Sequence, residues 1–116
     1  MTEIPAAPTG TGPAGRRLWS TIMAAYTLSE VEDVLLRQAV RTADHVNDLD
    51  AILTAQGLLV DGRAGEPKAH PLLAEVRQQR LVLARLLSAL RLPVDGSGAR
   101  TQHRSARGVY AVGVLS

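Results

Sequence analysis

The 116-residue chain contains no cysteine, no phenylalanine and only three aromatic side chains. The absence of cysteine excludes disulfides, thiolate catalysis and cysteine-based zinc sites. No apolar run approaches the roughly 20 residues that a membrane-spanning helix needs. Residues 1–15 include an acid at Glu3 and lack the apolar region of a signal peptide. The sequence therefore predicts a cytosolic protein with no membrane partner.

Hydrophobic residues nevertheless make up 46% of the chain, and most of them are leucine, valine and alanine. Leucine and alanine favour helices, which can pack against one another without aromatic side chains. The composition predicts an all-α fold. A domain of this size with polar ends buries only a modest fraction of its surface, and oligomerisation would offset that shortfall.

The net charge of +2 is unevenly distributed. Residues 1–62 carry four arginines against eight acids, whereas residues 63–116 carry nine basic residues against three acids. A basic half suits contact with a polyanion. Alternatively, the two halves complement each other, within one chain or between copies.

Three segments divide the chain. Residues 1–15 hold three prolines, three glycines and three threonines, and we expect them to be disordered or loosely attached. Residues 16–92 carry helical patterns and form the expected oligomerisation core. Residues 93–116 form a linker and a basic, flexible C-terminal tail.

The core begins with a short helix and continues with a long one. Apolar residues from Leu18 to Tyr26 share one stripe of a helix of about three turns. Ser29 and Glu32 form a capping box for a second helix, which ends near Gln56 at Gly57. Its heptad stripe falls at positions 35, 39, 42, 46, 49 and 53.

A third helix is predicted from about Pro71 to Arg91. The glycine-rich connector 57–70 can form a small β-hairpin, with Asp61-Gly62 as a hairpin-type turn. The heptad stripe of the third helix falls at positions 73, 76, 80, 83, 87 and 90. Two stripes of matched period joined by a short connector predict a long antiparallel helical hairpin.

No catalytic constellation is present, so we expect neither enzymatic activity nor a cofactor or metal. The three histidines fall on a helix, a connector and the tail, without metal-ligand spacing. Asp44 and Asp48 share a helix face and, with Asp50, resemble an acidic metal cluster. A solvated or salt-bridged helix surface explains this spacing more simply.

Arg80 interrupts an otherwise apolar stripe. A hairpin that folds about residue 63 places Arg80 opposite position 46, near Asp44 and Asp48. One hypothesis is a buried or interfacial ion pair that fixes the register of the hairpin. The alternative is that the Arg80 side chain extends outward to solvent.

Two groups of basic residues are candidates for DNA contact. No helix-turn-helix spacing is evident, and these residues are candidates for contact with phosphates. Arginines in flexible tails bind phosphates without reading sequence, although many are simply solvated. The candidates are Arg16, Arg17, Arg100, His103, Arg104 and Arg107.

The order of several motifs resembles one known family. An aromatic and aliphatic opening is followed by an acidic helix ending in Gln-Gly, a connector ending in His-Pro-Leu, and an arginine- and leucine-rich helix. These motifs include Trp19, Ile22, Tyr26, Leu28, Gln56, Gly57, His70, Pro71, Leu72, Glu75, Arg77, Arg80, Leu81, Leu86, Leu87, Leu90 and Leu92. Over residues 16–92 the chain resembles the P27-type small terminase subunits of tailed bacteriophages, although it lacks the helix-turn-helix of better-known small terminases.

The resemblance implies a role in viral genome packaging. Such subunits form homo-oligomeric rings, bind double-stranded viral DNA and present it to the large terminase subunit, which holds the ATPase and nuclease. It also implies the cytoplasm of a bacterial host as the location. The alternative is a helical structural or adaptor module with no nucleic-acid role.

Overall fold

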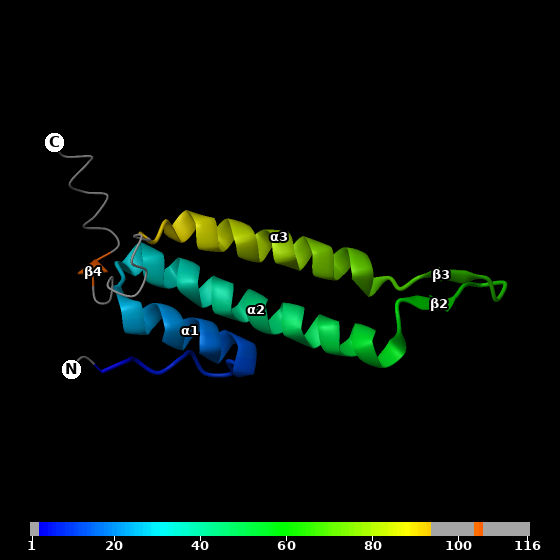
Figure 1. Ribbon diagram of the computed structural model, residues 1–116, viewed down its shortest axis with the longest axis horizontal. Coiled ribbons are helices and arrows are strands. Elements are labelled where there is room, and N and C mark those ends of the chain that lie inside the picture. Colours follow the sequence, from blue (N-terminus) through cyan, green and yellow to red (C-terminus); the bar gives the residue numbers. More distant parts are fainter. Residues whose placement is uncertain (1–2, 94–103, 106–116) are drawn as a thin grey trace.

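A computed structural model describes residues 3–93 and 104–105. Its helices are α1 (Pro13–Ala25), α2 (Glu30–Gln56) and α3 (Leu72–Leu90). Its strands are β1 (Tyr26–Thr27), β2 (Leu59–Asp61), β3 (Pro67–Ala69) and β4 (Arg104–Ser105). Helix α2 lies between α1 and α3 (Figure 1). The described part is mostly helical, as the composition predicts.

Helix α1 begins earlier than the sequence suggested, because Gly12 acts as its N-cap and Pro13 occupies its first turn. Residues 3–12, expected to be disordered or loosely attached, instead lie against the helices. The indole Nε1 of Trp19 donates to the Pro5 carbonyl oxygen at 2.8 Å, and Ala7 packs on the core. Hydrogen bonding to an otherwise unpaired indole fixes this segment in place.

Helix α2 confirms the predicted boundaries. The Ser29 hydroxyl accepts from the Glu32 N–H, and the Glu32 carboxylate accepts from the Ser29 N–H, which completes the capping box. Gly57 ends the helix with φ +87°, a backbone conformation that residues other than glycine rarely adopt. Every position of the predicted α2 stripe is buried or half-buried: 35, 39, 42, 46, 49 and 53.

The connector forms the expected β-hairpin, with Leu59 opposite Ala69 and Asp61 opposite Pro67. Its turn spans residues 62–66 rather than the Asp61-Gly62 dipeptide alone. Within this turn the Gly65 N–H donates to the Gly62 carbonyl oxygen, and Gly65 adopts the left-handed backbone conformation. The loop is therefore longer than a two-residue hairpin turn.

Helix α3 closes an antiparallel hairpin with α2, but its inward stripe differs in part from the predicted one. The buried or half-buried positions are 72, 73, 76, 79, 83, 86 and 90, whereas Arg80 and Leu87 are exposed. Positions 73, 76, 83 and 90 of the predicted stripe face inward. At the other two places the heptad pattern allows either of two neighbouring residues to face α2. Positions 79 and 80 are both polar and positions 86 and 87 are both leucine, so the sequence alone does not tell which of each pair faces inward.

The core lies where all three helices meet. Trp19 and Ile22 of α1, Leu36 and Val40 of α2, and Leu90 of α3 form one buried cluster. Because α1 has only 13 residues, it covers the N-terminal half of α2 and leaves the other half to α3 alone. None of the helices in the described residues is both long and apolar enough to cross a membrane.

Candidate nucleic-acid interface

The described DNA-contact candidates lie in the first turns of α1. Arg16 and Arg17 are both exposed. The Arg16 Nη1 donates to the Thr11 carbonyl oxygen at 2.6 Å, which orients its guanidinium beside the N-terminal segment. The candidates Arg100, His103 and Arg107 lie outside the described residues. Arg104 is described only through its backbone, which pairs with Tyr26 in a parallel β1–β4 ladder.

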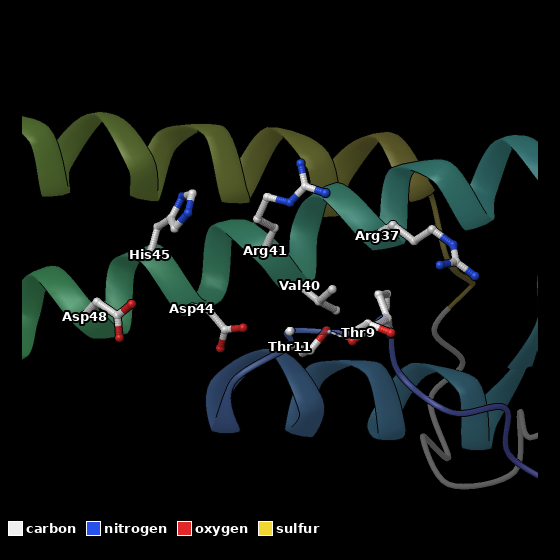
Figure 2. Close-up of a pocket in the computed structure, with 10 residues that line it drawn as sticks. Thr9, Thr11, Arg37, Val40, Arg41, Asp44, His45 and Asp48 are labelled. Atoms are coloured by element: carbon white, nitrogen blue, oxygen red, sulfur yellow. Dashed lines mark hydrogen bonds between the residues drawn. The ribbon is translucent and has the colours of Figure 1, made fainter.

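A polar cleft of about 300 Å³ opens beside this end of α1 (Figure 2). One wall is the turn Pro8–Thr11, in which the Thr11 N–H and hydroxyl both donate to the Pro8 carbonyl oxygen. The other wall is the exposed face of α2. The α2 residues that line the cleft are Arg37, Val40, Arg41, Asp44, His45 and Asp48.

Asp44 forms the junction between the cleft and α1. Its carboxylate accepts from the Gly12 N–H at 2.6 Å and from the Gly15 N–H at 2.7 Å. It therefore satisfies two of the unpaired donors at the N-terminus of α1 and complements the helix dipole there. A Cβ at Gly15 would lie 2.7 Å from both Asp44 Oδ2 and the Val40 carbonyl oxygen, so the close approach requires glycine.

Arg37 is held by two neighbours. Its Nε donates to Asp33 Oδ2 at 2.6 Å, and its guanidinium carbon lies 5.3 Å from the centroid of the Trp19 ring. The ion pair is surface-exposed and contributes little by itself, whereas the ring contact adds a cation–π attraction. The Arg37 side chain thus lies over the ring of the buried Trp19.

Arg41 and His45 continue the line of Arg37 along α2 at a four-residue spacing, which places all three on one face. In Figure 2 the side chains of Arg41 and His45 extend to the α3 side of the cleft, and those of Asp44 and Asp48 extend to the α1 side. Arg37 and Arg41 are not among the candidates predicted from the sequence, although their four-residue spacing is a signal that the sequence contains.

The cleft can therefore hold an anion at its arginine side. Asp44 is already occupied by two backbone N–H groups, but Asp48 remains an exposed acid in the same lining. The surface consequently offers a few phosphate contacts rather than a strongly basic groove.

The predicted pairing of Arg80 with Asp44 or Asp48 is wrong. Arg80 Nη2 instead donates to Asp50 Oδ2 at 2.7 Å, and the two side chains are 55% and 44% exposed. The β-hairpin register centres the fold at Ala64 rather than at residue 63, which places Arg80 opposite Asp48. Helical side chains also lean toward the N-terminus of their own helix, which directs Arg80 toward the connector and Asp50. The pair is a surface ion pair, not a buried one.

Beside this ion pair, an apolar groove of about 630 Å³ runs along the half of the hairpin that α1 leaves uncovered. Leu53, Leu58, Leu73 and Val76 contribute its apolar walls, with Asp50 and Arg80 at its edge. The form of this groove suits contact with another apolar surface.

His70 joins the two long helices at the base of the connector. Its side chain is buried, its Nδ1 accepts from the Leu72 N–H at 3.1 Å, and its Nε2 lies 2.7 Å from Gln56 Oε1. Because Nδ1 accepts, Nε2 carries the proton and donates to Gln56. His70 therefore has a structural role, and His45 is the exposed helix-face residue that was expected.

Among residues 3–93 and 104–105, no group of three or more potential ligands is arranged to hold a metal ion. Comparison with known protein families, with curated proteins and with solved structures finds no match to this chain.

Proposed function

We propose that the chain is a P27-type small terminase subunit, which binds double-stranded viral DNA and hands it to the large terminase subunit to start packaging. The proposal rests on the resemblance across residues 16–92. It is supported by the helical hairpin that these residues form, with the short helix α1 docked on it. In this role the protein works in the cytoplasm of the bacterial host and leaves ATP hydrolysis and DNA cleavage to its partner.

The observation that carries the DNA-binding part is the exposure of Arg16 and Arg17 on a docked helix. Both lie on α1, which Asp44 and the core hold in place, and Arg16 bonds to Thr11 in the wall of the cleft. Phosphates can reach these side chains without any rearrangement of the backbone. In a homo-oligomeric ring the weak contacts of single chains act together, so that modest sites give avid binding.

A salt series tests this proposal. We expect the double variant Arg16→Gln/Arg17→Gln to bind a random DNA duplex more weakly and to lower the slope of log K against log salt by up to about 2. Arg77→Gln/Arg85→Gln is the matched control, because it removes two exposed arginines from α3. An equal loss of affinity in both double variants would mean that only net charge matters, and it would exclude a specific role for the α1 arginines in DNA binding.

The basic tail is the second proposed contact, through Arg100, His103, Arg104 and Arg107. Replacing Arg100, Arg104 and Arg107 with glutamine leaves residues 109–115 in place and is expected to weaken binding to random duplex and to reduce its salt dependence. Fluorescence anisotropy across the same salt series measures both effects. Unchanged affinity and slope would exclude the tail arginines from DNA binding.

The alternative is a helical assembly or adaptor module without a nucleic-acid role. The large exposed apolar side chains of the hairpin favour it, because they fit protein contacts and not phosphates; they include Ile52, Leu58, Leu59, Leu81, Val82 and Leu87. This alternative would be favoured if duplex DNA does not retain the full-length chain, or if the retention does not depend on salt.

A further inference from the structure

The β2–β3 sheet stands apart from the helical core. It projects beyond the ends of α2 and α3 (Figure 1), and Leu58 and Leu59 beside it are 60% and 65% exposed. A two-stranded sheet alone is only marginally stable in water and gains from a third strand or a packed face. Within the described residues this sheet has neither.

The two edges of the sheet are not equivalent. The His70 N–H donates to the Leu58 carbonyl at 2.8 Å, and the Gly62 N–H donates to the Glu66 carbonyl at 2.6 Å. Because antiparallel pairs alternate along the ladder, residues 59 and 61 turn their N–H and C=O groups away from β3. On β3 the corresponding outward positions are Pro67 and Ala69.

Pro67 has no N–H, so the outer edge of β3 cannot complete a ladder with another strand. The outer edge of β2 keeps both of its N–H groups and both of its carbonyls. One edge is therefore blocked and the other is open to strand addition.

We propose that the open edge of β2 receives residues 109–115 of a second copy of this chain as a third strand. This segment lies outside the described residues, and the assignment rests on its sequence: it contains three valines and a tyrosine, which favour strands, and no charge. Main-chain pairing of this kind needs little side-chain specificity. Charge also matches, because Arg107 precedes the segment and Asp61 lies exposed on β2.

A second copy is required because the chain cannot reach its own sheet. Ser105 pairs with Thr27, beside the N-terminal end of α2. The sheet lies at the other end of α2, whose 27 residues span about 40 Å. The three residues between Ser105 and Val109 extend over no more than about 15 Å.

Each copy would then donate a C-terminal strand to one neighbour and accept one from another. Such a contact is heterologous: it closes into a ring if the rotation between copies allows, and otherwise forms a filament. This inference goes beyond the proposed DNA binding and holds or fails independently of it.

Cross-linking of the full-length chain tests the inference, because the natural chain has no cysteine and introduced thiols are unique. One batch carries Leu59→Cys on β2, and a second, affinity-tagged batch carries Tyr110→Cys, Val112→Cys or Val114→Cys. The batches are mixed, treated with a short bismaleimide and separated on a denaturing gel. Ala69→Cys, on the blocked edge, is the matched control.

We expect a cross-link between tagged and untagged chains with Leu59→Cys and none with Ala69→Cys. Adding Leu59→Pro to the chain that accepts the strand tests the edge itself, with the acceptor thiol moved to Asp61→Cys. This proline removes one outward N–H without breaking a bond to β3, and we expect it to abolish the cross-link. Absence of the cross-link with Leu59→Cys, or equal yield with Ala69→Cys, would overturn the proposal.

Discussion

At the scale of single residues, Asp44 has the most specific role in the described structure. It joins α1 to α2 by accepting from the Gly12 and Gly15 N–H groups. We expect Asp44→Ala to lower the free energy of unfolding by about 1–2 kcal/mol, as for loss of a helix cap. Urea unfolding monitored by circular dichroism measures the change. Asp48→Ala, one turn along the same helix and exposed, is the control and should be nearly neutral.

Arg80 is expected to matter less than a buried ion-pair residue would. Because its pair with Asp50 is about half exposed on both sides, we expect Arg80→Ala to cost less than about 1 kcal/mol in unfolding free energy. A double-mutant cycle with Asp50→Ala isolates the pair. A measured loss of several kcal/mol would mean that the two charges are shielded from solvent, contrary to the exposure seen here.

At the scale of elements, the docking of α1 depends on one buried cluster. A helix of 13 residues is marginal alone in water, so it relies on Trp19 and Ile22 packing against Leu36 and Val40. We expect Leu36→Ala to lower the free energy of unfolding by about 2–5 kcal/mol, because it leaves a cavity where the helices meet. Chemical denaturation measures this loss.

The control for this prediction lies two residues away. Val34 is on the same helix but is 57% exposed, and Val34→Ala should change stability by no more than about 0.5 kcal/mol. Because alanine favours a helix more than valine or leucine does, similar losses for both variants would show that the buried cluster does not set the stability of this region.

At the scale of the whole molecule, the exposed apolar surface predicts self-association. The half of the hairpin that α1 leaves uncovered carries an open apolar groove, and exposed leucines and valines lie along α3. Burying such surface between copies is the usual outcome. We expect light scattering at micromolar concentration to give a mass several times the 12.3 kDa of one chain. A constant monomer mass across a concentration series would contradict this expectation and weaken the proposed ring.

The sequence by itself determined helix α2 and both of its ends, because the signals for these are local. The capping box at Ser29 and Glu32 and the positive φ of Gly57 act within a few residues, and the structure confirms both. The period of the α2 stripe and the turn-forming connector were enough to predict an antiparallel helical hairpin with a small β-hairpin between its helices.

Only the tertiary structure decided which residues meet across the chain. Arg80 pairs with Asp50 rather than with Asp44 or Asp48, and Asp44 instead caps α1 from 29 residues away. Leu86 and Leu87 fit the period of α3 equally well, so packing against α2 selected Leu86. Likewise, the N-terminal segment has the composition of a loosely attached chain, but the hydrogen bond from the Trp19 indole to the Pro5 carbonyl oxygen holds it in place. These outcomes depend on contacts between distant residues, which no local pattern encodes.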